Sequence, residues 1–195
     1  MPLDERAQRI VETAMEMAER DGYDAVRLRE LSEKAGVALG TVYRRFSSKE
    51  EILAAALELL VEQLKAQLQR YMIPGETPQE RLDGFFSVGT RILAQRPKLA
   101  SAMLRTVSSG EPELSEKVTR YHGQMTELIL AVYRGTFSED LPSHNELALA
   151  GLLQHVWFGA LVGWTGGMHS HEVVIEQMTT ATRLLLRGLE HEQGS

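Results

Sequence analysis

The sequence has no cysteine, and this absence excludes disulfide scaffolds, cysteine-based zinc sites and thiol chemistry together. It also lacks a run of the ~18 uninterrupted apolar residues that a membrane span needs. Residues 1–6 lack the apolar core of a signal peptide. We therefore expect a cytoplasmic protein that does not enter a membrane.

Patterns typical of catalysis are scarce as well. The sequence has no glycine-rich phosphate loop and no nucleophile elbow. His169 and His171 are two residues apart, and two such ligands do not complete a coordination sphere by themselves, so we interpret them as part of a polar loop between helices. The sequence predicts no enzyme activity, no cofactor and no metal site.

What the chain does have is helical periodicity over its whole length. Its 195 residues are 43% apolar, which is enough to bury a core without crosslinks. Apolar residues recur at spacings of three and four, and no segment alternates as a strand would. We predict an all-α fold of about nine helices, comprising a three-helix domain over residues 1–50 and a helical bundle over residues 51–195. The expected helices lie at about 4–20, 28–35, 39–45, 49–71, 78–95, 99–107, a stretch of about 25 residues carrying Leu114 to Val132, 144–165 and 172–189.

The second and third expected helices have the layout of a helix-turn-helix motif. A turn beginning with Gly36 separates them, and Val37 can fill the space between them. Leu31 and Val42 fall on the faces that the two helices turn toward each other. The positions left exposed on the helix expected at 39–45 are Leu39, Gly40, Thr41, Tyr43 and Arg44. A glycine lets a sugar-phosphate backbone approach closely, and hydroxyl and guanidinium groups donate hydrogen bonds to phosphates.

Local charge favours the same interpretation. The whole chain carries a net charge of −6, but residues 27–49 contain six basic and two acidic residues, a local balance of about +4 that leaves about −10 elsewhere. An acidic molecule with one basic edge directs that edge toward a phosphate backbone. Lys49 adds a cation in the first turn of its expected helix, where N–H groups already favour anions.

Residues 36–53, GVALGTVYRRFSSKEEIL, resemble the signature of the TetR family of transcriptional regulators. The resemblance implies a three-helix DNA-binding domain, a ligand-binding bundle, a homodimer, and DNA contacts, mostly at phosphates, from the positions of Gly40, Thr41, Tyr43 and Lys49. The family usually has Thr and Ser caps where this chain has Arg27 and Ala38, and each missing cap costs about 1 kcal/mol. We predict that DNA is contacted by Arg27, Arg29, Leu39, Gly40, Thr41, Tyr43, Arg44 and Lys49.

The bundle contains bulky apolar residues that can line a ligand cavity between helices. The candidates are Phe85, Phe86, Met103, Tyr121, Met125, Trp157, Phe158 and Trp164. Plain core packing is the alternative for each of them. Residues 156–164 and 183–188 also resemble the KstR branch of the family, repressors of steroid catabolism, and this resemblance implies a hydrophobic effector such as an acyl-CoA or a steroid-like metabolite.

Residues 152–164 are apolar on nearly every side, and such a helix must be covered on two faces. One face can meet its own bundle, and the other, with the last helix, predicts a four-helix dimer interface. The residues assigned to it are Gly151, Gly159, Gly163, Val174, Met178, Ala181 and Leu185. Full burial within one subunit is the alternative.

These observations together predict a ligand-responsive transcriptional regulator, more specifically a repressor. It would bind a palindromic double-stranded DNA operator as a homodimer and be released by a hydrophobic small molecule. Two hypotheses from other classes stay open. One is a helical adaptor for protein partners, and the other is a carboxylate-bridged metal enzyme without DNA binding, although the sequence has no Glu-x-x-His pair.

Overall fold

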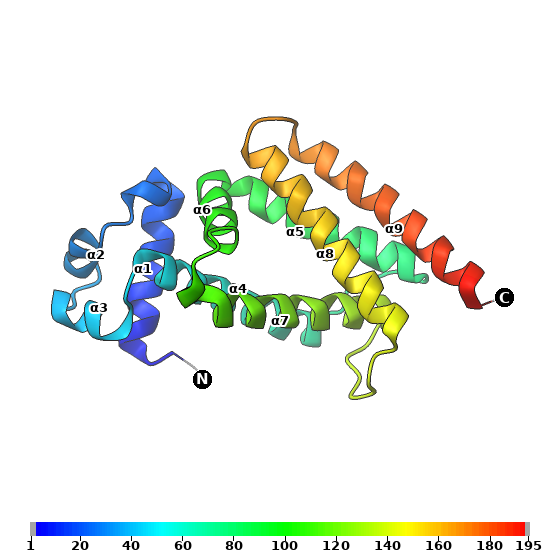
Figure 1. The fold of residues 1–195 in the computed structure, drawn as a ribbon, viewed down its shortest axis with the longest axis horizontal. Helices are drawn as coiled ribbons and strands as arrows, with labels where there is room; N and C mark the ends of the chain where they lie inside the picture. Colours follow the sequence, from blue (N-terminus) through cyan, green and yellow to red (C-terminus); the bar gives the residue numbers. More distant parts are fainter. Residues whose placement is uncertain (1–2, 194–195) are drawn as a thin grey trace. The chain divides into compact units, whose positions relative to one another are not determined.

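The computed structural model describes residues 3–193, and the regular secondary structure of this part of the chain consists of nine α-helices and two 3₁₀ turns, without a strand (Figure 1). The elements are α1 (Glu5–Asp21), η1 (Tyr23–Ala25), α2 (Leu28–Lys34), α3 (Leu39–Arg45), α4 (Lys49–Arg70), α5 (Pro78–Gln95), α6 (Pro97–Val107), η2 (Pro112–Leu114), α7 (Ser115–Arg134), α8 (His144–Thr165) and α9 (His171–Gln193). The all-α fold class and the number of helices predicted from the periodicity are confirmed.

Several helices begin where a capping side chain stands. The Asp4 carboxylate accepts a hydrogen bond of 2.8 Å from the Ala7 N–H at the start of α1. Ser143 and Glu146 form a complete capping box at the start of α8. One boundary differs from the expectation. Because Pro112 opens the separate turn η2, Leu114 precedes α7 instead of lying within it, although its side chain is buried in the core.

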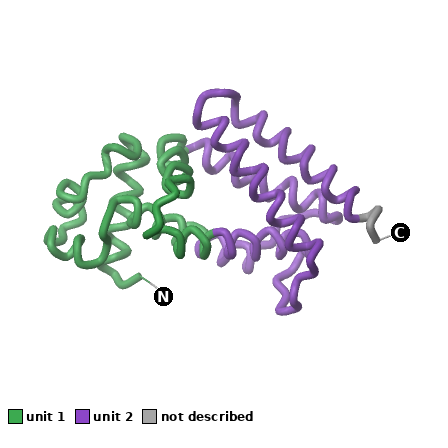
Figure 2. Tube along the Cα trace, viewed as in Figure 1, with its two compact units in different colours: residues 1–61, 96–121 green, residues 62–95, 122–195 purple. Residues whose placement is uncertain are grey.

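The chain forms two compact units that are not continuous in sequence (Figure 2). Unit 1 comprises residues 1–61 and 96–121, and unit 2 comprises residues 62–95 and 122–195. Helices α4 and α7 each contribute residues to both units. This division differs from the one expected at residue 50, because α6 packs against α1 and joins the N-terminal unit.

The core of unit 1 is a single cluster of buried apolar side chains. Ile10, Val11 and Ala14 of α1 are fully buried at its centre, where Leu31 of α2 and Val42 of α3 reach them. The side chains of Leu99, Ala102 and Met103 bring α6 into the same cluster. The three N-terminal helices therefore share their core with a helix that lies about fifty residues farther along the chain.

Unit 2 is a helical bundle in which α5 and α8 both pack against α9. Phe86, Leu128, Leu153 and Met178, from four different helices, are fully buried within it. Among the described residues, α8 is the one helix long and apolar enough to cross a membrane, and 44% of its most apolar window is buried inside the structure. Its packing against α9 identifies it as a core helix of this bundle.

Candidate nucleic-acid interface and effector region

The turn between α2 and α3 has the geometry that the helix-turn-helix interpretation requires. Gly36 has φ of 63°, a left-handed conformation that glycine adopts without steric cost. The Val37 N–H donates a hydrogen bond of 3.0 Å to the Ser32 carbonyl, and the Val37 side chain packs against the core between the two helices. This arrangement fixes α3 with Val42 fully buried and the opposite side of the helix facing out.

The outward face of α3 is accessible to a partner. Tyr43 is 57% exposed, and Arg44 and Gly40 are exposed beside it. A Cβ at Gly40 would meet nothing within 4 Å, so the fold itself does not require glycine there. Thr41 and Leu39 are half-buried at the edges of this face. The structure therefore presents all five predicted α3 residues on one side of the helix or at its margin.

Basic side chains flank this face at the start of α2. Arg27 and Arg29 are exposed, and the Arg27 guanidinium lies 3.4 Å from the Glu30 carboxylate. Neither α2 nor α3 has a side-chain cap, because Arg27 and Ala38 stand at the two N-cap positions. The backbone N–H groups of these two first turns are therefore not capped by their own N-cap side chains.

The first turn of α4 holds Lys49. The Ser48 hydroxyl accepts a hydrogen bond of 3.1 Å from the Glu51 N–H, as a capping box requires. The capping box is not completed by the Ser48 N–H: the Glu51 carboxylate accepts instead from the N–H of Ser47, at 2.7 Å, and from the Lys117 ammonium of α7, also at 2.7 Å. Burial acts to raise the pKa of Glu51, but these donors outweigh it and hold the pKa below its usual range.

Lys49 shares one aromatic ring with a second cation. The Lys49 ammonium lies 3.9 Å from the centroid of the Tyr23 ring, and the guanidinium of Arg105, in the last turn of α6, lies 4.0 Å from it. Each cation is also 3.7 Å from the Asp24 carboxylate. The Tyr23 hydroxyl donates a hydrogen bond to Glu50. Burial and the Glu50 carboxylate raise the pKa of Tyr23, so the phenol stays protonated.

Three of the eight predicted effector residues converge in unit 2. The Trp157 ring lies 5.4 Å from the ring of Phe86 and 6.3 Å from that of Phe85, measured between centroids. The Trp157 indole N–H donates a buried hydrogen bond of 3.0 Å to the Thr90 hydroxyl. A Cβ at Gly89 would lie 3.1 Å from the indole, so Gly89 is what lets α5 and α8 approach at this point. The result is a tightly packed aromatic cluster.

The other five predicted effector residues are distributed over both units. Met125 is buried in unit 2, and Phe158 and Trp164 are partly buried on α8. Met103 and Tyr121 belong to unit 1, where they pack in or against its core. Burial raises the pKa of Tyr121 to about 12.

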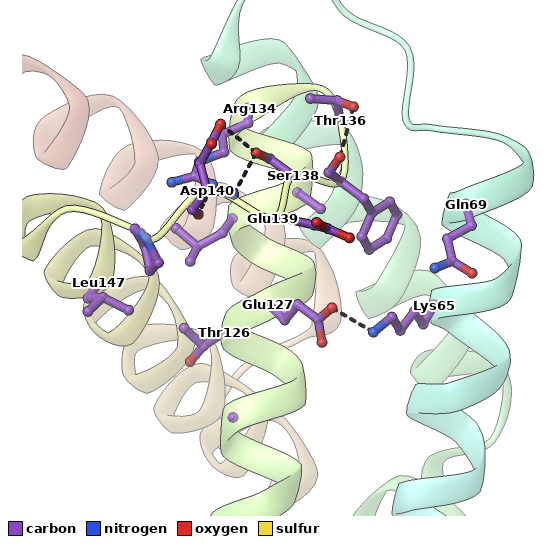
Figure 3. A pocket seen from close by; sticks show the side chains of 15 residues that line it. Lys65, Gln69, Thr126, Glu127, Arg134, Thr136, Ser138, Glu139, Asp140 and Leu147 are labelled. Atoms are coloured by element: carbon purple, nitrogen blue, oxygen red, sulfur yellow. Dashed lines mark hydrogen bonds and ion pairs between the residues drawn. The ribbon is translucent and has the colours of Figure 1, made fainter.

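A cleft that the sequence did not predict lies elsewhere in unit 2. Its volume is about 540 Å³, and it is lined by α4, α7, the loop after α7 and the start of α8 (Figure 3). Lys65 and Glu127 form an ion pair of 2.6 Å that joins α4 to α7 across it. Arg134 holds its far wall with two hydrogen bonds to the Glu146 carboxylate, at 2.7 and 2.9 Å. The sole sequence signal for the cleft was the polar loop around Pro142.

The residues assigned to a dimer interface occupy different environments. Val174 and Met178 are 0% and 1% exposed, so they belong to the core of their own subunit. Gly163 is buried, and a Cβ there would lie 2.6 Å from the ring of His169. Gly159 is exposed, and Gly151, Ala181 and Leu185 are partly buried. Among the described side chains of these two helices, the exposed large apolar residues are Leu147, Leu152, Val156 and Val162 of α8 and Leu184 of α9.

Within the described residues, no three His, Asp or Glu side chains are grouped closely enough to hold a metal ion. His171 lies 3.2 Å from Glu172, and its ring meets that of Trp164 edge to face.

Two family models match consecutive parts of this chain. Residues 10–56 match the model of bacterial regulatory proteins of the tetR family, and residues 75–185 match the model of the tetracyclin repressor-like C-terminal domain. The HTH-type transcriptional repressor KstR of Rhodococcus jostii (strain RHA1) is 30% identical over 182 residues, which cover 93% of this chain and 83% of that protein.

Two solved structures have the same fold. A TetR transcriptional regulator from Rhodococcus sp. RHA1 superposes with a TM-score of 0.83 at 26% identity, over 93% of this chain and 95% of that one. Thermus thermophilus FadR, a transcriptional repressor in complex with lauroyl-CoA, superposes with a TM-score of 0.72 at 21% identity, over 93% and 94% of the two chains. The relatives are named for regulating transcription and not for catalysis.

Proposed function

The chain belongs to the TetR family of bacterial regulatory proteins, and we propose that it is a ligand-responsive repressor that acts in the cytoplasm. It binds a palindromic operator as a homodimer, and a hydrophobic small molecule releases it. On this proposal it is not an enzyme and needs no cofactor.

One observation carries the DNA-binding part of this proposal. The outward face of α3 has an exposed tyrosine, an exposed arginine and a glycine with open space around it, in a chain whose net charge is −6. Arg27, Arg29 and Lys49 supply positive charge beside that face. A helix of this kind fits a major groove, with the flanking cations on the phosphates.

The test is a double substitution, Tyr43→Ala with Lys49→Ala. The duplex would be selected by the wild-type protein from a random pool, and affinity measured by fluorescence anisotropy at fixed salt. We expect about a hundredfold weaker binding from the loss of two backbone contacts, with an unchanged dimer. Arg120→Ala is the matched control: it removes an exposed arginine of α7 that pairs with Glu58 of α4, and it should keep the wild-type affinity. Unchanged binding by the double variant would show that α3 and Lys49 do not form the DNA-binding surface.

The dimer part of the proposal is supported by the surface of α8 and α9. Leu152 and Val156 are 50% and 38% exposed, and Val162 and the bare Gly159 lie on the same helix. Leu184 adds an exposed apolar side chain from α9. Two copies of such a stripe, related by a two-fold axis, form a four-helix interface. We therefore assign partner contacts to these residues, together with the partly buried Gly151, Ala181 and Leu185.

The effector part of the proposal is supported by relatives and by composition. The chain is similar to KstR over 93% of its length, and Thermus thermophilus FadR holds lauroyl-CoA on the same fold. Within unit 2, Phe85, Phe86, Met125 and Trp157 are buried apolar side chains of the kind that line sites for acyl or steroid groups. We propose these four as the centre of the effector site.

Effector release has a direct test. Lauroyl-CoA, a sterol ketone and free coenzyme A would each be added to the complex of the wild-type protein with its selected duplex. We expect at least one of the two apolar probes to release the DNA, and free coenzyme A to leave the complex intact. Release by coenzyme A alone would contradict an apolar effector.

A further inference from the structure

The basic edge beside α3 does not end with the helix-turn-helix motif. Arg105 of α6 lies against the same tyrosine ring as Lys49, at 4.0 Å against 3.9 Å from the centroid, so the two cations are no farther apart than the sum of these distances. Both also lie 3.7 Å from one carboxylate, that of Asp24. Lys49 and Arg105 therefore form one local pair of positive charges, contributed by α4 and α6.

Arg105 is both firmly based and accessible. The helix that carries it is fixed to α1 by the buried side chains of Leu99 and Met103 and by a hydrogen bond of 2.7 Å from the Lys98 ammonium to the Arg20 carbonyl. The Arg105 side chain nevertheless stays 60% exposed. A rigid helix with an exposed guanidinium in its last turn can present two parallel donors to a phosphate.

The anion that now faces this pair is a poor permanent partner. The Asp24 side chain is 84% exposed, and its two ion pairs are long. An exposed ion pair of this kind contributes little stability, because water and salt screen it. A DNA phosphate, which carries its charge on oxygens that accept both donors, can replace this carboxylate at small cost.

We propose that Arg105 binds a phosphate of the operator backbone beside the one held by Lys49. Helix α6, which lies within the C-terminal family match, is then part of the DNA interface. This inference rests on the proposed function, since it requires that the chain bind DNA through α3 and Lys49. It adds a contact that lies outside the residues matched to the DNA-binding family model.

The salt dependence of binding tests this contact, because it reports the number of phosphates that the protein contacts. Each phosphate contact that is lost lowers the slope of log affinity against log salt by about 0.9. The experiment compares Arg105→Gln, Lys49→Gln and the double variant on the selected duplex, with Arg120→Gln as the control. We expect the slope to fall by about 0.9 in each single variant and by about twice that in the double variant. Arg120→Gln and Arg105→Lys keep the wild-type slope.

Two further measurements separate direct contact from indirect positioning. If Arg105 acted only by positioning Lys49 through Tyr23, its substitution would have no effect in the Lys49→Gln background, and that result would overturn the inference. Asp24→Asn removes the competing carboxylate and should raise affinity severalfold, an outcome that misfolding does not produce. An unchanged affinity in Asp24→Asn, or a wild-type slope in Arg105→Gln, would also overturn it. Failure of the wild-type protein to bind any duplex would instead overturn the proposed function itself.

Discussion

At the scale of single residues, Gly40 is the position where fold and function separate most clearly. Glycine normally weakens a helix, by about 0.5–1 kcal/mol relative to alanine. In this chain it stands in α3 with open space where a Cβ would project, so packing gives no reason for it. The DNA contact proposed above would supply a reason, because a glycine lets a sugar-phosphate backbone approach closely.

Substitution of this glycine makes a two-sided prediction. Gly40→Ala should leave the melting temperature equal to or slightly above that of the wild type, because alanine favours the helix. It should weaken operator binding about tenfold, the equivalent of one lost charge-assisted hydrogen bond. Thermal unfolding and anisotropy titration measure the two effects. Gly123→Ala, another exposed helical glycine with open space, serves as the control and should change neither binding nor fold.

At the scale of elements, the ends of the helices carry energetic consequences that can be tested. Ala38 stands at the N-cap of α3 with φ of −65° and ψ of 139°, the extended conformation that a capping serine adopts. Ala38→Ser should therefore add about 0.5–1 kcal/mol to the free energy of unfolding and raise the melting temperature by about 1–4 °C. Ala66→Ser is the control. It lies at an exposed position inside α4, where no N-terminal N–H group needs a cap, so it should not raise the melting temperature.

The start of α8 predicts a specific pH dependence. The Arg134 guanidinium, with the donors of Ser143, holds the pKa of Glu146 at about 2, although burial opposes this. Because the folded pKa lies below the ordinary 4.5, the carboxylate stabilises the fold above pH 4.5, and that contribution is lost as the pH falls toward 2. Glu146→Gln should lower the melting temperature at pH 6 and flatten its decline between pH 6 and pH 3.

An exposed acid in the neighbouring loop provides the comparison for this prediction. Glu139→Gln alters a carboxylate that lines the same cleft without the bidentate arginine, and its melting curves should follow those of the wild type. If the melting temperature of Glu146→Gln fell as steeply between pH 6 and pH 3 as that of the wild type, other groups would be responsible for the loss of stability in acid.

Most of the elements could be predicted from the sequence, because local signals determine them. Glycines, prolines and capping residues mark helix boundaries close to those of the structure, as at Gly36 after α2 and at Ser143 before α8. How the helices pack was harder to predict from the sequence. Val174 and Met178 have the same apolar character as surface residues of α8, and no local signal tells whether such a side chain faces its own bundle or a partner. The cleft depends on a loop conformation and left almost no trace in the periodicity.

At the scale of the whole molecule, the exposed apolar stripe on α8 predicts the assembly state. Leu152→Glu should leave the subunit folded, because the side chain is already half exposed. It should weaken dimerisation by roughly a hundredfold or more, since two-fold symmetry buries the new charge twice. Sedimentation at micromolar concentration measures this. Leu141→Glu, at a loop residue that is 93% exposed, should remain dimeric.

The sharing of one core between the N-terminal helices and α6 has a consequence for engineering. An N-terminal domain that is cut at residue 50 and grafted onto another regulator would lose Leu99, Ala102 and Met103 from its core. The loss would leave a cavity lined with aliphatic side chains. A chimaera that transfers residues 1–61 together with 96–121 keeps that interior whole. A domain of this protein can therefore be exchanged only as a spatial unit, and its two separate segments of sequence must be transferred together.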